Sequence, residues 1–520
     1  MMGEPIKTGH TARFIVASPS LANNTADVER LKNAVCKAFG IDSIRIPFEI
    51  VRRLPGKLKQ WGHDVKAAVI KGYGGWELLD LKAGDGKAFF LGAAADIGTT
   101  RVVLRLVNLE TGEAIAEAGF DNPQTEIGPD ILTRIHYAGS GRGLETLQDM
   151  IITGMNENIA KLCRQSGTTP DDVCILSAAG NTSMTHLFLG IESAGIIREP
   201  YIPCVNMPDL IEARKIGVEI GETARVFLFP NIGSYFGGDL VAGILDSGLD
   251  RMNETGIMVD VGTNAEVVVG NAEMMIACAG AAGPALEGGI SDIGMTAAPG
   301  VIDRVTYEPA AENLAVHTID DQPAAGICGS GMIDLAAALF LGGFVDIRGK
   351  FDPEKCADRL LEKDGIYHFI LADSADSATG EAILISQVDL DLLTSSKAAM
   401  YTILEVIVCN TAGLDFNDLA HFFVAGTFGS FIDPRSAISI GMLPDIPIDR
   451  FRVLGNSSLN GAEKFLQEPG QVDRVARIRN NITYIELNVN QEFMNMFSGA
   501  KFYPHTDRSR FPSVPLKPTA

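Results

Sequence analysis

The pattern of hydrophobic and polar positions along the chain predicts long helices alternating with buried strands. Apolar residues recur at helical spacing over 144–167, and again over 395–413. Continuous apolar runs at 172–181 and 421–433 each lead into a turn, which is typical of buried strands. Strand-turn-helix units of this kind predict an α/β fold.

Residues 11–90 differ in texture and predict a small α+β unit. The segments "ARFIVASP", "RIPFEIVRRLP" and "VKAAVIKGYGGWELLDL" are rich in apolar and β-branched residues and predict strands. The segment "TADVERLKNAVCKAFG" predicts a helix that Thr25 caps and Gly40 ends.

The changes in texture predict four parts. We expect a small N-terminal domain over residues 1–90, a first lobe over 91–255, a second lobe over 256–490 and a C-terminal extension over 491–520. The extension is irregular and Pro-rich towards its end, so we expect it to be loosely packed.

Two predicted hairpins carry the same polar residues in the same order. The stretch "VDVGTNAEVVV" (259–269) predicts a strand, a tight turn and a second strand, and "AAADIGTTRVVLRLV" (93–107) repeats it. The turn residues are Asp260, Gly262, Thr263 and Asn264 in one copy, and Asp96, Gly98, Thr99 and Thr100 in the other.

Glycine in such a turn lets the backbone approach a ligand and point its N–H groups outward, and an aspartate at the strand end suits Mg²⁺. The repeat predicts two related lobes that hold a triphosphate from both sides, with the metal between Asp96 and Asp260. The alternative is a pair of ordinary hairpins with Asp-Gly turns.

Two further glycine-rich segments point to the same chemistry. In "AAGICGSGMIDLAAALFLGGF", Gly326, Gly329, Ser330 and Gly331 precede an apolar helical pattern, a place suited to a phosphate or ribose. In "VAGTFGSFIDP", Gly426 follows a predicted strand. Neither segment has the spacing of a dinucleotide-binding or P-loop motif.

The composition narrows the classes of partner. The 520 residues carry a formal net charge of −22, which disfavours nucleic acid and anionic membranes as partners. We find no apolar run long enough to span a membrane and no signal-peptide pattern, so we expect a cytoplasmic protein. The eight cysteines lack the spacing of iron–sulfur or zinc ligands and are expected to be mostly buried free thiols.

Taken together, the hairpins and glycine loops resemble the actin, sugar-kinase and Hsp70-like ATPase superfamily. Within it, the chain is similar to the reductive activators of corrinoid proteins, which include the activator of the corrinoid iron–sulfur protein and the methylamine-methyltransferase activator of methanogens. The resemblance spans roughly residues 10–510 and rests on these motifs: "NPQTEIGPDILTRI", "GNTSMTHLFLG", "FPNIGSYFGGDLVAGIL", "GPALEGG", "GICGSGMID" and "AGTFGSFIDPRSAISIGMLPD".

The resemblance implies that ATP hydrolysis drives reduction of Co(II) to Co(I) in a corrinoid protein of a methyltransferase system. It implies ATP and Mg²⁺ as cofactors and a homodimer as the assembly. The family also implies an iron–sulfur domain, for which this sequence has no ligand motif. Either the chain is truncated or a separate donor such as ferredoxin supplies the electron; a minor variant is a cluster bridged by a dimer near Cys174 or Cys278.

The resemblance also assigns roles to individual residues. Asp96, Asp260 and Asp239 are the predicted catalytic residues, and the first two are the predicted metal ligands. Asp239 would orient the attacking water, or else act as the N-cap of the following helix. The predicted nucleotide-binding residues are Gly98, Thr99, Thr100, Asn181, Gly262, Thr263, Asn264, Glu287, Gly329, Ser330, Gly331, Gly426 and Thr427.

Two other functions remain open from the sequence. One is a small-molecule kinase of the same superfamily, which would turn over ATP with a small substrate and without a protein partner. The other is a nucleotide-dependent binding module without redox activity, which the absent cluster motif favours.

Overall fold

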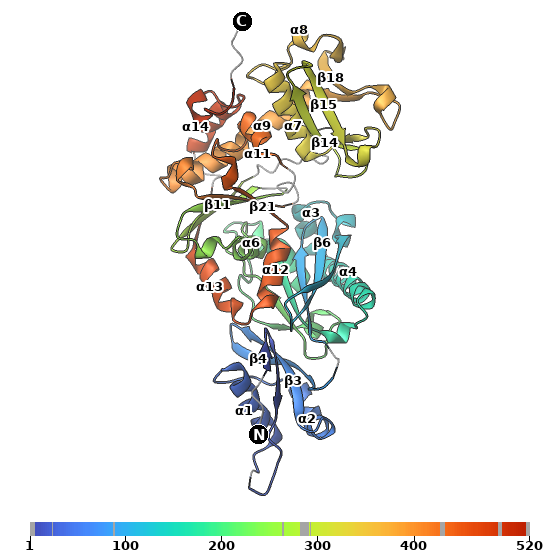
Figure 1. Cartoon of the computed structure of the whole chain (residues 1–520), viewed down its shortest axis with the longest axis vertical. Helices are drawn as coiled ribbons and strands as arrows, with labels where there is room; N and C mark the ends of the chain where they lie inside the picture. The colour runs from blue at the N-terminus through green and yellow to red at the C-terminus, as the bar shows by residue number, and fades with distance from the viewer. Residues whose placement is uncertain are drawn as a thin grey trace. The chain divides into compact units, whose positions relative to one another are not determined.

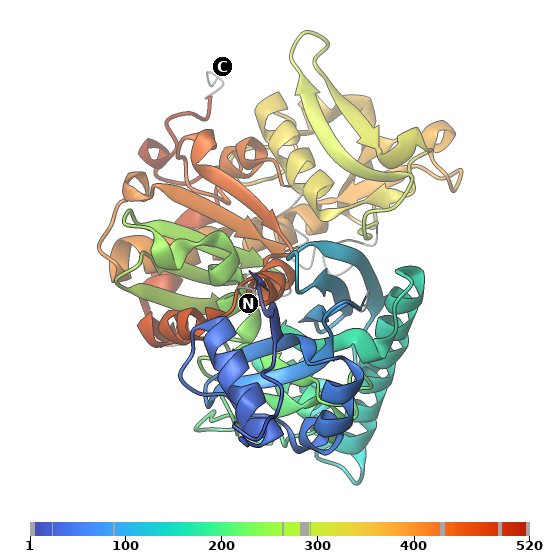
Figure 2. The same ribbon diagram turned by 60° about the horizontal axis from the view of Figure 1, so that its bottom comes forward.

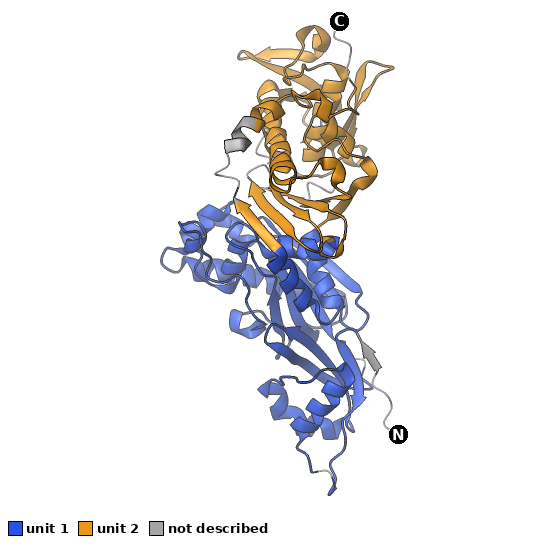
Figure 3. Ribbon diagram, turned by 90° about the vertical axis from the view of Figure 1, so that its left-hand side faces the viewer, with its two compact units in different colours: residues 1–248, 457–481 blue, residues 249–456, 482–520 orange. Residues whose placement is uncertain are grey.

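The computed structural model describes residues 6–22, 24–86, 89–262, 265–280, 291, 293–426, 432–486 and 491–515. The chain forms two units (Figure 3): unit 1 comprises residues 1–248 and 457–481, and unit 2 comprises 249–456 and 482–520. The predicted four-part division stays a prediction of domain organisation. By compactness alone, the segment 457–481 belongs with the first unit although it follows most of the second in sequence.

Unit 1 begins with a small antiparallel sheet that two helices cover. The strands β1 (Ile6–Thr8), β2 (Thr11–Ile15), β3 (Asp64–Gly72) and β4 (Gly75–Ala83) pair in chain order. Helices α1 (Asp27–Phe39) and α2 (Phe48–Gln60) lie on one face of this sheet (Figure 2), and their buried side chains share a core with those of the strands.

Two predictions for this region were wrong. The segment "RIPFEIVRRLP" contributes to helix α2 and not to a strand, because Ile50, Leu54 and Leu58 recur at helical spacing and are all buried. Helix α1 has Ala26 at its N-cap, without a side-chain hydrogen bond, so Thr25 does not cap it. Gly40 does end this helix in the left-handed conformation, as predicted.

The main sheet of unit 1 has the strand order β7-β6-β5-β8-β10-β9. Its strands are β5 (Leu91–Ile97), β6 (Arg101–Asn108), β7 (Ala114–Asp121), β8 (Val173–Gly180), β9 (Ile211–Glu212) and β10 (Arg225–Leu228). Because β5, β8 and β10 run parallel, their carboxyl ends meet at one edge of the sheet. The helices of this part are α3 (Ile131–Ala138), α4 (Gly143–Gln165), α5 (Thr182–Leu189) and α6 (Gly238–Ser247) (Figure 1).

Helices α12 (Ser457–Gln467) and α13 (Gln471–Asn481) complete unit 1. Helix α12 packs closely on α6. The two helices approach so closely at Gly461 that a Cβ there would overlap the carbonyl group of Ala242. The ring of Phe465 stacks on that of Phe227 with centroids 3.8 Å apart. Helix α12 is therefore part of the core of unit 1.

Five strands of the main sheet of unit 2 repeat the spatial order of five strands in unit 1. Its order is β21-β20-β11-β12-β13-β22, with β11 (Gly256–Val261), β12 (Ala265–Gly270), β13 (Met275–Gly280), β20 (His421–Ala425), β21 (Phe451–Gly455) and β22 (Ile482–Glu486). In each unit the first three strands form a meander, and two later strands add in parallel beside the first: β8 and β10 in unit 1, β20 and β21 in unit 2. The remaining strand differs, because β9 pairs antiparallel with β10 whereas β22 pairs in parallel with β13 at the opposite edge. The prediction of two related α/β lobes is confirmed.

Unit 2 also contains two smaller sheets and a helical layer. The sheets are β15-β14-β16 and β17-β18-β19, built from β14 (Val301–Glu308), β15 (Asn313–Thr318), β16 (Gly326–Ile327), β17 (Leu360–Lys363), β18 (Ile366–Ala372) and β19 (Ile383–Ser386). The helices are α7 (Gly329–Gly342), α8 (Pro353–Cys356), α9 (Gln387–Glu405), α11 (Pro434–Ser439) and α14 (Gln491–Ala500).

A π-helical turn, Val406–Thr411, extends helix α9. Among the described residues, Gln387–Thr411 is the one helical segment long and apolar enough to cross a membrane, by length and composition alone. Since 72% of its apolar window is buried inside the structure, it has the character of a core helix.

The end of the chain is not loosely packed, at least through residue 515. Tyr503 and Phe511 are each only 1% exposed and belong to the core of unit 2. The buried ammonium of Lys397 donates to the carbonyl oxygen of Pro504 at 2.9 Å. The expectation of a loose extension failed because Pro residues there break regular structure, while the aromatic side chains between them still bury apolar surface.

Candidate nucleotide site

The first predicted hairpin, formed by β5 and β6, places Asp96 at the carboxyl edge of the unit 1 sheet. Asp96 is the penultimate residue of β5 and lies opposite Val103 on β6 and Ala179 on β8. The turn that follows needs a glycine at position 98, because a Cβ there would overlap the carbonyl oxygen of Arg101. The hairpin, with its aspartate and close backbone turn, is therefore present as predicted.

Asn181 ties the tip of this hairpin to the start of helix α5. Its side-chain oxygen accepts from the backbone N–H of Met184 at 2.9 Å, which caps the helix, and its side-chain amide donates to Thr99 Oγ1 at 3.0 Å. A second amide, Asn122, donates from Nδ2 to the carbonyl oxygen of Gly98 at 2.9 Å. These contacts bring Asn181 and the hairpin together and hold the turn in one conformation.

Asp239 lies in the first turn of helix α6, beside the same hairpin. The helix starts at Gly238 with Gly237 at the N-cap, so the alternative in which Asp239 is the N-cap was wrong. Burial raises the pKa of Asp239 to about 6; a hydrogen bond from the backbone N–H of Leu240 opposes this rise, and the negative charge of Asp96 adds to it. The two carboxylates are thus close enough for each to affect the other's charge.

Gly237 and Gly238 stand where a Cβ atom would overlap neighbouring groups. A Cβ at Gly237 would lie 2.6 Å from Asp239 Oδ1 and 2.9 Å from the carbonyl oxygen of Gly180. A Cβ at Gly238 would lie 2.5 Å from the carbonyl oxygen of Phe229. The helix therefore starts directly against the ends of the strands, and its first-turn N–H groups add positive potential there.

Ser458 is a member of this cluster that sequence reasoning missed. Its hydroxyl donates to Asp96 Oδ1 at 2.8 Å. The two residues are 362 positions apart, and Ser458 lies in the first turn of α12. The one available signal was the pair of serines that opens a helical pattern, and that signal alone predicts a helix start and not a contact with Asp96.

The second hairpin, formed by β11 and β12, places Asp260 beside Gly426, the residue that follows strand β20. Asp260 lies opposite Glu266 on β12 and Ala425 on β20. Gly426 has a φ of 86°, and a Cβ there would lie 2.8 Å from Asp260 Oδ1 and 2.5 Å from the carbonyl oxygen of Val261. The backbone of Gly426 therefore packs directly against the aspartate.

Several predicted residues lie outside the described part of the chain. Gly262 follows β11 and is described. The residues for which no placement is given are Thr263, Asn264, Glu287 and Thr427. Their predicted roles in nucleotide binding stay predictions.

Gly329, Ser330 and Gly331 form the first turn of α7, as predicted for a glycine loop that opens a helix, and all three are buried. The hydroxyl of Ser330 donates to the carbonyl oxygen of Asp303 at 3.3 Å, and a Cβ at Gly331 would overlap the carbonyl of Ile302. These contacts pack α7 against β14, so what this turn can offer a ligand is its backbone N–H groups rather than a side chain.

The residues present in unit 1 fit a magnesium nucleotide. Two carboxylates, a turn that excludes Cβ atoms and a helix N-terminus converge at one sheet edge, which is what a metal-bound phosphate requires. The side chains that would hold the metal and the phosphates there are Asp96, Thr99 and Asn181, with Asp239 beside them.

The described residues do not fit an iron–sulfur cluster. They include all eight cysteines, which are free, and five of these are buried. In the described ranges, no three or more His, Cys, Asp or Glu residues gather where they could hold a metal ion. Cys174 and Cys278 are 2% and 0% exposed, so as placed neither reaches the surface to bridge a cluster between subunits.

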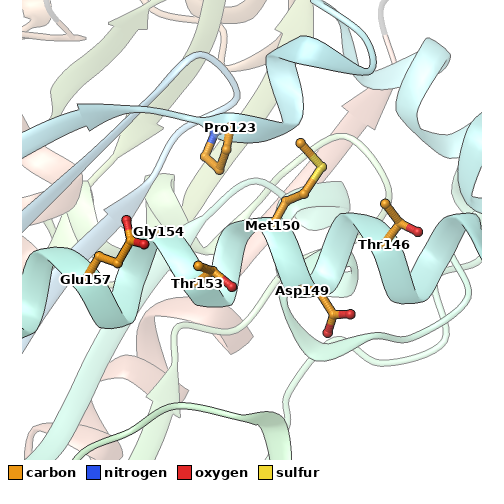
Figure 4. Close-up of a pocket in the computed structure, with 7 residues that line it drawn as sticks. All are labelled: Pro123, Thr146, Asp149, Met150, Thr153, Gly154 and Glu157. Atoms are coloured by element: carbon orange, nitrogen blue, oxygen red, sulfur yellow. The ribbon is translucent and has the colours of Figure 1, made fainter.

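A separate hollow of about 430 Å³ lies on the surface of helix α4 (Figure 4). Its lining residues are Pro123, Thr146, Asp149, Met150, Thr153, Gly154 and Glu157. No predicted site residue lines it, and it is open to solvent, so we assign it no part in the nucleotide site.

Comparison with known proteins decides the family. Three regions of one protein family match the chain in succession: the RACo linker region over residues 10–88, the RACo middle region over 91–252, and the C-terminal domain of RACo, the ASKHA domain, over 254–515. This chain belongs to the family of reductive activators of corrinoid proteins. The ASKHA class comprises the sugar-kinase, Hsp70 and actin-like ATPases, which confirms the predicted fold class and implies ATP binding.

Individual reductive activators agree with this assignment. The corrinoid activation enzyme RamQ of Eubacterium limosum is 30% identical over 417 residues, covering 78% of this chain and 69% of that protein. The [Co(II) methylated amine-specific corrinoid protein] reductase of Methanosarcina barkeri is 24% identical over 451 residues, covering 78% and 76%. The solved structure of a reductive activator for corrinoid, iron–sulfur protein is 34% identical, covers 98% of this chain and 81% of that one, and superposes with a TM-score of 0.86.

Proposed function

We propose that the protein is an ATP-dependent reductive activator of a corrinoid protein in a methyltransferase system. The observation that carries this proposal is the succession of three regions of the reductive-activator family along residues 10–515. The proposal extends to a corrinoid protein of a methylamine-type methyltransferase system as the partner, which is the kind of substrate that the Methanosarcina barkeri relative is named for.

In the proposed mechanism, the described residues bind and orient Mg–ATP. Asp96 and Asp260 would hold the metal, and the Gly98 turn would allow the phosphates to approach the backbone. Asp239 accepts a proton from the attacking water, a role that suits a carboxylate with a pKa of about 6. Bound Mg–ATP supplies the free energy of phosphoanhydride hydrolysis, and the proton released from water passes first to Asp239.

The cobalt of the partner is the substrate of the redox step. Co(II) gains one electron to become Co(I), and a separate low-potential donor, such as a ferredoxin, loses it. Since the described residues offer no ligands for an iron–sulfur cluster, they take no part in the electron transfer of this mechanism. ATP acts by favouring one arrangement of the nucleotide-binding units, to which the corrinoid protein binds with different affinity.

We further propose a cytoplasmic homodimer.

The experiment that tests this function follows the visible spectrum of a Co(II) corrinoid protein under strict anaerobiosis. We expect formation of Co(I) when the chain, Mg–ATP and a low-potential reductant are all present. Omission of ATP should abolish the reaction, and omission of the donor should prevent repeated turnover. Repeated reduction by the iron-free chain without any donor would contradict the division of labour between ATPase and donor.

The same samples address the alternative functions. If no corrinoid protein binds in any nucleotide state, the proposal fails, and ATP consumption with small sugars or carboxylates would then identify a kinase. If binding depends on nucleotide but cobalt is never reduced even with a donor, the chain is a nucleotide-dependent binding module.

A further inference from the structure

The contact between Ser458 and Asp96 has a geometry that a helix-capping serine would not have. A serine at the start of a helix normally accepts a hydrogen bond from the backbone of its own first turn. Ser458 instead donates to Asp96 Oδ1, on another element, at 2.8 Å. Ser458 is only 6% exposed, so solvent cannot readily replace this bond.

The two lobes place Ser458 and Asp239 in equivalent positions. Helix α6 follows β10 and α12 follows β21, and each of these strands lies in parallel beside the neighbour of its sheet's first strand. Asp239 and Ser458 are each the second residue of their helix. The two helices pack together in unit 1, where both second residues interact with Asp96.

These two neighbours affect Asp96 in opposite ways. Asp239 is an anion when ionised and repels the charge of Asp96, whereas the Ser458 hydroxyl donates a hydrogen bond to it. A hydroxyl that donates to Oδ1 favours one orientation of the carboxylate. Partners that orient a metal-ligating carboxylate in this way raise its affinity for the metal.

We infer that Ser458 is a positioning residue that orients Asp96 for the magnesium ion of the bound nucleotide. This inference rests on the proposed ATPase function. It assigns to the first turn of α12, a helix that follows most of the second lobe in sequence, a role at the phosphate hairpin of the first lobe. Ser458 acts through Asp96 and does not itself contact the nucleotide.

The adjacent serine provides a matched control. Ser457 is also buried, at 1% exposure, and its hydroxyl has no hydrogen-bond partner among the described residues. Ser457→Ala and Ser458→Ala therefore remove the same atom from the same helix turn, and only the second removes a bond to Asp96. Ser458→Thr keeps the hydroxyl and tests rescue.

The measurement is calorimetric titration of the full chain with ADP, in EDTA and in excess Mg²⁺. The ratio of the two dissociation constants reports how much the metal strengthens nucleotide binding. We expect Ser458→Ala to lower this ratio about tenfold, with the affinity in EDTA little changed. Ser457→Ala should retain the wild-type ratio, and Ser458→Thr should recover most of it.

The ATPase reaction gives a second measurement. In Ser458→Ala, the Mg²⁺ concentration for half-maximal rate should rise about tenfold, and kcat should largely recover at saturating Mg²⁺. A general packing defect would lower kcat at every Mg²⁺ concentration. An unchanged metal dependence in Ser458→Ala, or an equal change in Ser457→Ala, would overturn the inference. A wild-type protein that binds no ADP at all would instead overturn the nucleotide site itself.

Discussion

The two acid-bearing hairpins share residue order and strand order, yet their surroundings differ. Asp96 is surrounded by side chains: Ser458 donates to its carboxylate, and Asp239 lies close enough to repel it. Asp260 is packed against main chain, because Gly426 leaves no space for a Cβ between itself and the carboxylate. Among the described residues, side chains act on the carboxylate of the first aspartate, and the backbone of Gly426 packs against the second.

Two hairpins with the same motif therefore need not tolerate the same substitutions. At the first hairpin, neighbouring side chains can be changed one atom at a time without moving the backbone. At the second, one neighbouring group is a glycine with a positive φ, where any side chain is strained.

The largest effect should follow loss of either carboxylate charge. Asp96→Asn and Asp260→Asn each keep the shape of the side chain but remove a charge that faces the metal. We expect ATPase turnover to fall at least tenfold in each variant, which corresponds to about 1.4 kcal/mol or more of transition-state stabilisation. Steady-state ATP hydrolysis measures this. Unchanged turnover in both variants would show that the hairpins are not the metal site.

Asp239→Asn should increase stability while it lowers activity. Because the pKa of Asp239 is raised to about 6 in the folded protein, the folded state disfavours its ionised form. Its contribution to stability is present below its ordinary pKa of about 4, and it is lost as pH rises from there through about 6. Above pH 6, the nucleotide-free and metal-free Asn variant should therefore be more stable, by about 3 kcal/mol at most.

Denaturant unfolding of the Asp239→Asn variant and the wild type between pH 5 and pH 8 would test this. The difference in unfolding free energy should grow with pH and level off above about pH 7. Asp96→Asn should lower the pKa of Asp239 and so move this dependence to lower pH. A difference that does not vary with pH would mean that Asp239 is not destabilised by its charge.

Gly426→Ala should affect the second hairpin more than a comparable glycine elsewhere in the unit. Gly413 also has a positive φ, of 68°, but its missing side chain would meet nothing within 4 Å. Both Ala variants lose about 1 kcal/mol from the left-handed backbone. Gly426→Ala should lose about a further 1 kcal/mol of stability and about fivefold in turnover, because its Cβ displaces Asp260. If the Gly426→Ala and Gly413→Ala variants have equal unfolding free energies and equal turnover, the close approach of Gly426 to Asp260 affects neither property.

The smallest effect concerns the tip of the first hairpin. Asn181→Ala removes the cap of α5 and the donor to Thr99. Asp130→Ala removes the cap of α3, which accepts from the backbone N–H and the hydroxyl of Thr133. Both should lose about 1 kcal/mol of stability. Asn181→Ala alone should raise the KM for ATP, by about threefold. If Asp130→Ala raises it equally, Asn181 has only a structural role.

The sequence predicts the parts of this fold that depend on local patterns. Both hairpins, helix α4 and strand β8 are confirmed, because their apolar periodicity and glycine positions are properties of neighbouring residues. The strand predicted at 45–55 was wrong, because apolar residues over so short a stretch fit a strand and a helix equally well. The helical spacing becomes clear only when it is followed as far as Leu58.

Contacts between residues far apart in the chain could not be predicted from the sequence. Ser458 could not be predicted as a neighbour of Asp96, since no local pattern encodes a contact over 362 positions. Nor could the packing of α12 on α6, which needs Gly461 to meet the backbone at Ala242. The glycine motif at 329–331 was recognised, but its burial against β14 depends on which face of the helix meets the sheet.

The placement of α12 and α13 in the first unit has a consequence for biosynthesis. A ribosome that has completed residue 248 has not yet made residues 457–481, which finish that unit. At ~5–20 residues per second, the missing helices emerge roughly 10 to 50 s later. Until then, the nascent chain exposes the surfaces of Phe227 and Ala242 that α12 covers. The phosphate hairpin of the first lobe is therefore made early but acquires its serine partner only after most of the second lobe has been translated.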